Sequence, residues 1–162
     1  MIRWLSLAGV VVVADQATKA IVDQTLAHGE RINLLPVFSL VHWQNEGAAF
    51  SMLANAGGWQ RWFFVALAAG MSAYIIYELK RLPANQWLLG VAFSLILGGA
   101  VGNGLDRAIS GYVVDFILVH YRSWYFPAFN VADSALFLGA VCWIWLMISD
   151  LRKGSEHVGD NR

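Results

Sequence analysis

The chain of 162 residues is 58% hydrophobic and 14% charged, with a mean hydropathy of +0.53, which is too apolar for an ordinary soluble domain. Its 11 Lys and Arg residues balance its 11 Asp and Glu residues, so it lacks the basic excess of a nucleic-acid-binding protein. The single cysteine, Cys142, excludes an intramolecular disulfide and a cysteine-based metal site. The composition therefore predicts an integral membrane protein without a nucleic-acid partner.

Apolar segments occur along the chain at lengths close to the roughly 20 helical residues needed to cross a bilayer. The predicted spans cover about residues 4–22, 60–79, 87–104 and 131–149. The first 14 residues also resemble a short signal peptide, and cleavage after Ala14 is the alternative. However, the apolar pattern resumes after Lys19 and continues to Val22, which favours a first transmembrane helix.

Two stretches outside these spans have the composition of β-strands. Residues 33–44 and 112–120 are rich in β-branched and aromatic side chains. The expected fold class is thus a membrane all-α domain, covering residues 1–162, in which four transmembrane helices carry a small extramembrane β platform. We expect residues 151–162 to form a short, disordered polar tail.

Basic residues favour a cytoplasmic location for both termini, which an even number of spans places on one side. On the terminal side, basic residues crowd short segments beside helix ends, namely Arg3, Lys80, Arg81, Arg152 and Lys153. On the opposite side they are spread over two long loops, namely Arg31, Arg61, Arg107 and Arg122. The bias is slight by count but supported by this density, so the β platform is expected on the outer, periplasmic face.

This topology gathers the polar residues of the apolar regions at the outer surface. They are Asp15, Lys19, Asn45, Asn103, Asp106, Arg107, Asp115 and Asp133. Polar residues that were merely tolerated would be scattered over both ends of the helices. Ionisable residues near hydrocarbon are costly and mark functional sites, so the asymmetry predicts a site at this surface.

Local structure explains some of these residues without a function. Asp15 and Lys19 are four residues apart on a helix and can form an ion pair. Asp133 follows Asn130 by three residues at the start of the last span. Asn130 can therefore cap the helix, and the helix dipole can stabilise the negative charge of Asp133 in the first turn. Asp115 has no such local explanation, because it interrupts an apolar, strand-like run. It requires a tertiary partner, for which we suggest Asp133.

Other chemistries have weaker support in the sequence. A serine peptidase would need Ser134 activated by Lys19, and neither residue lies in a characteristic motif. The four histidines lack paired ligand spacing, so no metal is expected. Residues 98–102 include three glycines that would let another helix, or a substrate helix, approach closely. A small membrane transporter or scaffold is a further alternative, although its charges should follow a path through the bilayer.

Five motifs, in order along nearly the whole chain, resemble those of the bacterial lipoprotein signal peptidase, or signal peptidase II, family. They are Asp15-Gln-Ala-Thr-Lys19, Asn45-Glu-Gly-Ala-Ala-Phe50, the segment Gly98 to Arg107, Val113-Val-Asp-Phe116 and Phe129-Asn-Val-Ala-Asp133. The resemblance implies a bacterial inner-membrane aspartyl endopeptidase that removes signal peptides from prolipoproteins, cutting before a diacylglyceryl-modified cysteine. Its partners would be lipid-modified precursors and membrane lipid, and we expect a monomer that needs no cofactor.

The resemblance also implies roles for individual residues. Asp115 and Asp133 would be the catalytic dyad. The residues that would shape and support the site are Asp15, Lys19, Asn45, Asn103, Asp106, Arg107 and Asn130. The chemistry suits a dyad, because two carboxylates about 3 Å apart cannot readily both ionise and so share one proton. The sequence does not indicate which aspartate holds that proton.

Overall fold

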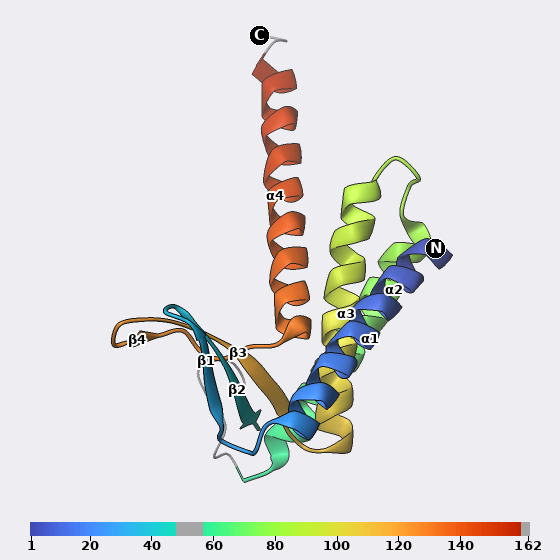
Figure 1. Cartoon of the computed structure of the whole chain (residues 1–162). Helices are drawn as coiled ribbons and strands as arrows, with labels where there is room; N and C mark the ends of the chain where they lie inside the picture. The colour runs from blue at the N-terminus through green and yellow to red at the C-terminus, as the bar shows by residue number, and fades with distance from the viewer. Residues whose placement is uncertain (48–56, 160–162) are drawn as a thin grey trace.

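Four long helices and a small sheet make up the described residues, and both the start of the first helix and the end of the last lie remote from the sheet (Figure 1). The computed structural model describes residues 1–47 and 57–159, with side chains described up to residue 151. The helices are α1 (Ile2–Thr25), α2 (Trp59–Arg81), α3 (Trp87–Ile109) and α4 (Val131–Gly159). Within the described residues, each of these four contains an apolar stretch long enough to cross a membrane, which confirms the predicted fold class.

Two helix ends differ from the sequence-based boundaries. Helix α3 continues past residue 104 to Ile109 and therefore carries Asp106 and Arg107. It ends where Gly111 adopts a φ of 89° and donates its N–H back to the carbonyl of Arg107 at 3.1 Å, a common glycine C-cap. Helix α4 continues to Gly159, so the expectation of a disordered tail from residue 151 was wrong over most of its length. That stretch contains no proline to stop the helix.

Helix α3 is the centre of the bundle and packs against α1, α2 and α4. Its glycines allow this: a Cβ added to Gly98 would lie 2.6 Å from Val11 Cβ on α1, and one added to Gly99 would collide with the Ala132 carbonyl on α4. The close approach predicted for residues 98–102 therefore exists. It is used by the chain's own helices, which leaves this surface unavailable to the substrate helix that we also considered.

The sheet is antiparallel in the order β1-β2-β3-β4 over the described residues. Its strands are β1 (Arg31–Leu35), β2 (Phe38–Asn45), β3 (Val113–Tyr121) and β4 (Trp124–Tyr125). The stretch predicted as one strand, 33–44, is a hairpin turning at Pro36 and Val37, because proline fixes φ and cannot donate to a ladder. The two-residue β4 is too short to leave a sequence pattern.

Hydrogen bonds from the backbone and from one side chain hold the sheet against the helices. Phe129, just before α4, receives bonds from the N–H groups of Phe116 and Ile117 and donates to the Ile117 carbonyl at 3.0 Å. The buried His42 on β2 contacts the Leu26 carbonyl at the end of α1 through Nδ1, at 2.9 Å. As a result, β3, the end of α1 and the first turn of α4 are held together at one end of the bundle (Figure 1).

Candidate active site

Asp133 is fixed by a reciprocal cap at the start of α4. Asn130 precedes the helix, and its Oδ1 accepts the N–H of Asp133 at 2.9 Å. In return, Asp133 Oδ2 accepts the N–H of Asn130 at 3.2 Å. This is a capping box in which an aspartate takes the third helical position. The capping role predicted for these two residues is therefore correct, and it holds the Asp133 carboxylate in a defined direction.

Asp115 lies on β3 with 4% of its surface exposed, and amides contact both of its oxygens. Asn130 Nδ2 donates to Oδ1 at 2.8 Å, and Asn45 Nδ2 donates to Oδ2 at 3.0 Å. Because the side-chain oxygen of Asn130 also accepts the backbone N–H of Asp133, the Asn130 side chain links the two acidic residues. Asn45 comes from the end of β2, so three segments distant in sequence are joined around one carboxylate.

Each of the four oxygens of the two acids accepts an N–H donor. The remaining oxygen, Asp133 Oδ1, accepts from Asn103 Nδ2 on α3 at 2.7 Å. Burial and, to a smaller extent, the nearby charge of Asp133 raise the pKa of Asp115 to about 6, although the hydrogen bonds from Asn45 and Asn130 partly oppose this rise. Asp115 therefore retains a proton over a range in which an exposed aspartate would be ionised.

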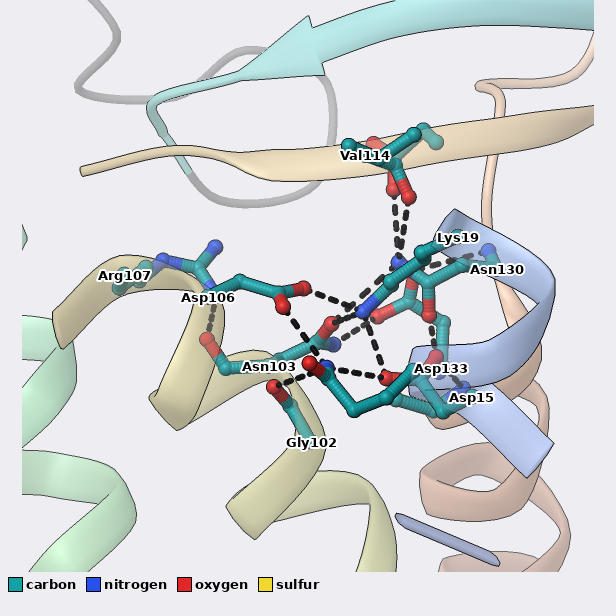
Figure 2. Close-up of polar contacts among 12 residues, drawn as sticks. Asp15, Lys19, Gly102, Asn103, Asp106, Arg107, Val114, Asn130 and Asp133 are labelled. Atoms are coloured by element: carbon teal, nitrogen blue, oxygen red, sulfur yellow. Dashed lines mark hydrogen bonds and ion pairs between the residues drawn. The ribbon is translucent and has the colours of Figure 1, made fainter. Parts of the chain in front are cut away.

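Lys19 connects α1 to α3 through its contacts with Asn103 and Asp106 (Figure 2). Its buried ammonium donates to Asp15 Oδ2 at 2.7 Å and to Asp106 Oδ2 at 2.5 Å. The ion pair expected from the four-residue spacing is thus present, and a second acid joins it. Asp15 Oδ1 accepts the N–H of Ala132 in the first turn of α4 at 2.9 Å, so the cluster joins three helices.

The same ammonium determines how the amide of Asn103 is oriented. Lys19 Nζ donates to Asn103 Oδ1 at 2.8 Å. Because an ammonium only donates, the oxygen of this amide must face Lys19, and its NH₂ group must face Asp133. Helix α3 accommodates the cluster because Gly102 has no side chain, and a Cβ there would lie 2.7 Å from Asp15 Oδ2.

Arg107 occupies the opposite side of the site. Its guanidinium donates to the Gly47 carbonyl at 2.7 Å and to the Asn103 carbonyl at 3.3 Å, and it lies 4.9 Å from the centre of the Phe64 ring. The nine site residues predicted from the sequence thus gather in one region. Part of one motif, residues 48–50, lies outside the described residues.

A cavity of about 1240 Å³ opens beside the two acids. The polar residues that line it include Asn45, Asn103, Arg107, Asp115 and Asp133. The other walls are largely apolar and come from the sheet, the segment before α4 and α4 itself, namely Trp43, Leu118, Tyr125, Phe126, Phe129, Leu136 and Phe137. The arrangement suits a ligand with a long apolar part and a polar group presented to the carboxylates.

The contacts argue against the serine alternative. Ser134 donates its hydroxyl proton to the Asn130 carbonyl at 2.9 Å, and Lys19 is held by two carboxylates and an amide, so it is not free to act as a base. No cluster of three His, Cys, Asp or Glu residues that could bind a metal occurs in the described part of the chain. The polar groups also gather at one end of the bundle, unlike the path expected of a transporter.

Sequence reasoning missed some participants in the site. Gln16 donates to Asp106 Oδ1 at 2.7 Å, and the Gly47 carbonyl and the Phe64 ring both contact Arg107. Gln16 had a signal, because it lies three residues before Lys19 and so shares its side of a helix. Gly47 lies within the second motif but was given no role, and the contact with Phe64 has no pattern in the sequence.

Comparisons with known proteins agree with one another. The profile of the family described as signal peptidase (SPase) II matches residues 7–149. A lipoprotein signal peptidase from Pseudoalteromonas translucida (strain TAC 125) is 51% identical over 137 residues, which cover 85% of this chain and 82% of that protein. One from Ectopseudomonas mendocina (strain ymp) is 50% identical, covering 94% and 89%. A solved structure described as a bacterial membrane enzyme is 30% identical, with a TM-score of 0.83, covering 93% and 90%.

Proposed function

Because the chain belongs to the signal peptidase II family, we propose that it removes the signal peptides of prolipoproteins with Asp115 and Asp133 as its catalytic carboxylates. By family it is a peptidase, and its four apolar helices make it a multi-pass protein of the bacterial inner membrane. One observation carries the assignment of the dyad: two carboxylates from distant segments face one cavity, and each of their oxygens accepts an N–H donor.

The proposed mechanism uses one proton shared by the two acids. The ionised member takes a proton from a water molecule as that water attacks the scissile carbonyl, and the protonated member donates to the carbonyl oxygen. The tetrahedral intermediate then collapses as a proton passes to the leaving nitrogen. No covalent acyl-enzyme forms. The raised pKa of Asp115, about 6, supports the presence of a proton on the dyad, which titrates as one coupled unit.

The surrounding residues would keep the dyad in its reactive geometry. Lys19 would hold the Asn103 amide with its NH₂ group toward Asp133. Asp15 would anchor the first turn of α4 through the Ala132 N–H. Arg107 would bring positive charge to the cavity wall, which favours the ionised member of the dyad. These roles depend on position, so each residue should affect the rate even without touching the substrate.

The cavity suggests how a lipidated precursor would bind. Its apolar walls on α4 and the segment before it suit the signal peptide and the acyl chains of the modified cysteine. The scissile bond would lie beside the dyad, before that cysteine, while the acyl chains extend into the bilayer. Relatives named lipoprotein signal peptidase support this substrate class. We further propose a monomer with both termini in the cytoplasm and the site near the outer face, in keeping with the basic turn at Lys80 and Arg81.

A synthetic precursor peptide tests this function. The purified protein should shorten a peptide carrying a diacylglyceryl cysteine to a product that begins at that cysteine, as measured by mass spectrometry. The same peptide without the lipid is the substrate control and should be cut much more slowly. A Ser134→Ala variant should still cleave the peptide, because the proposed mechanism uses no serine nucleophile. An intact peptide under all conditions, or cleavage at another bond, would contradict the proposal.

A further inference from the structure

Gln16 contacts the ionic cluster at the edge of the proposed site. Its Nε2 donates to Asp106 Oδ1 at 2.7 Å and lies 3.3 Å from both the Gly102 carbonyl and Asp15 Oδ2. Lys19 donates to the other oxygen, Asp106 Oδ2, at 2.5 Å. Both oxygens of Asp106, on α3, are thus contacted by donors from α1. Neither the sequence pattern nor the resemblance gave Gln16 a role of its own.

The ammonium of Lys19 has three N–H donors and contacts three oxygens. Two carboxylates, Asp15 and Asp106, contact it at 2.7 and 2.5 Å, whereas the neutral oxygen of Asn103 lies at 2.8 Å. Away from water, a carboxylate attracts an ammonium far more strongly than an amide does. An Asp106 without another donor would therefore draw Lys19 away from Asn103. The Gln16 amide supplies that other donor.

We propose that Gln16 is a positioning residue for the Asp115 and Asp133 dyad, an inference that rests on the proposed function. By donating to Asp106, it keeps Lys19 in contact with Asn103 Oδ1. Asn103 then keeps its NH₂ group on Asp133 Oδ1, at 2.7 Å. Gln16 does not touch the dyad itself and acts through three intervening side chains.

Two substitutions separate hydrogen bonding at this position from space filling. Leucine has a volume close to that of glutamine but no donor. Glutamate adds a third carboxylate to a cluster whose charged members facing position 16 are Asp15, Asp106 and Lys19. When protonated, that glutamate regains one donor. Gln24 lies exposed on the same helix, so the same changes at Gln24 are matched controls.

The experiment measures kcat and KM for the diacylglyceryl precursor peptide over a range of pH. Misplacing a catalytic group by about 1 Å costs about 100-fold in rate, so we expect Gln16→Leu to lower kcat by about 10-fold to about 100-fold with KM nearly unchanged. At alkaline pH the kcat of Gln16→Glu should be lower than that of Gln16→Leu. Relative to wild type it should recover as the pH falls, because its carboxyl group becomes a donor. The Gln24 variants should behave as wild type.

Several results would overturn the inference. A wild-type kcat in Gln16→Leu would do so. Equal losses of kcat in the leucine and glutamate variants at every pH would also do so, because the rate would then not depend on a hydrogen-bond donor at position 16. A loss confined to KM or to the yield of folded protein would also do so. These results leave the dyad intact, provided that the wild type cleaves the peptide. If the wild type fails to cleave it, the proposed function fails and this inference falls with it.

Discussion

Replacing Asp115 with asparagine should make the protein more resistant to unfolding at alkaline pH, although it removes a proposed catalytic group. Asp115 is 4% exposed, and burial together with the charge of Asp133 raises its pKa to about 6. Its ionised form is therefore disfavoured in the folded protein. Asparagine carries no charge and has nearly the same shape, so it should fit the position without the penalty of a buried charge.

The size of the effect follows from the pKa. The difference between the ordinary value of 3.8 and about 6 corresponds to roughly 3 kcal/mol, lost from the wild type as the pH rises through 6. The single side-chain oxygen of asparagine can accept a hydrogen bond from the amide of Asn130 or from that of Asn45, but not from both. Its NH₂ group then faces the other amide's NH₂ group, and the lost hydrogen bond costs about 1 kcal/mol. The variant should therefore gain roughly 2 kcal/mol at pH 8. That gain should shrink as the pH falls below 6 and reverse near 4, where wild-type Asp115 is protonated.

Thermal unfolding followed by tryptophan fluorescence in detergent measures this difference at several pH values. A gain of roughly 2 kcal/mol corresponds to a rise in Tm of about 4 °C or more for a chain of this size. Asp150→Asn is the control, because Asp150 lies exposed on α4, and its Tm should change little. A destabilised Asp115→Asn variant at pH 8, or a difference that does not vary with pH, would refute the reasoning.

Two further changes probe the packing beneath the site. Lys19→Met leaves the buried Asp15 and the partly buried Asp106 without their cation, which should cost roughly 3–5 kcal/mol and reduce the folded fraction measured by size-exclusion chromatography. The exposed Lys80→Met is the control, and equal yields would contradict the expectation. Gly99→Ala puts a Cβ against the Ala132 carbonyl and should lower stability by about 1–3 kcal/mol, whereas Gly70→Ala meets no described atom within 4 Å and should leave Tm unchanged or slightly higher.

Hydropathy made the helices predictable, because each span is an uninterrupted apolar stretch near the required length. The site region was also predictable, since topology alone brings the end of α3 and the start of α4 to the side of the sheet (Figure 1). Asp115 was identifiable because an acid within an apolar strand has no local explanation. The cap formed by Asn130 and Asp133 follows from a spacing of three residues.

The amide contacts could not be predicted from the sequence. Whether Asn103 faces Lys19 or another group depends on how α1 and α3 are rotated against each other, and side-chain amides leave no periodic pattern. The glycines of α3 predicted that another helix packs closely there. The sequence could not show whether that helix belongs to the chain itself, as α1 and α4 do, or to a substrate. Gln16 was overlooked because the charged residues around it, Asp15 and Lys19, could be explained by each other.

The central claim, that Asp115 and Asp133 together perform the cleavage, is tested most directly by comparing Asp115→Asn and Asp133→Asn with the wild type. Each variant is purified from membranes, checked for its folded state, and incubated with the diacylglyceryl precursor peptide, while product is quantified by mass spectrometry. Asp150→Asn, exposed on α4, is the control and should cleave at the wild-type rate. We predict folded protein and no detectable product from either dyad variant. Cleavage by either one at a rate near that of the wild type would contradict the account.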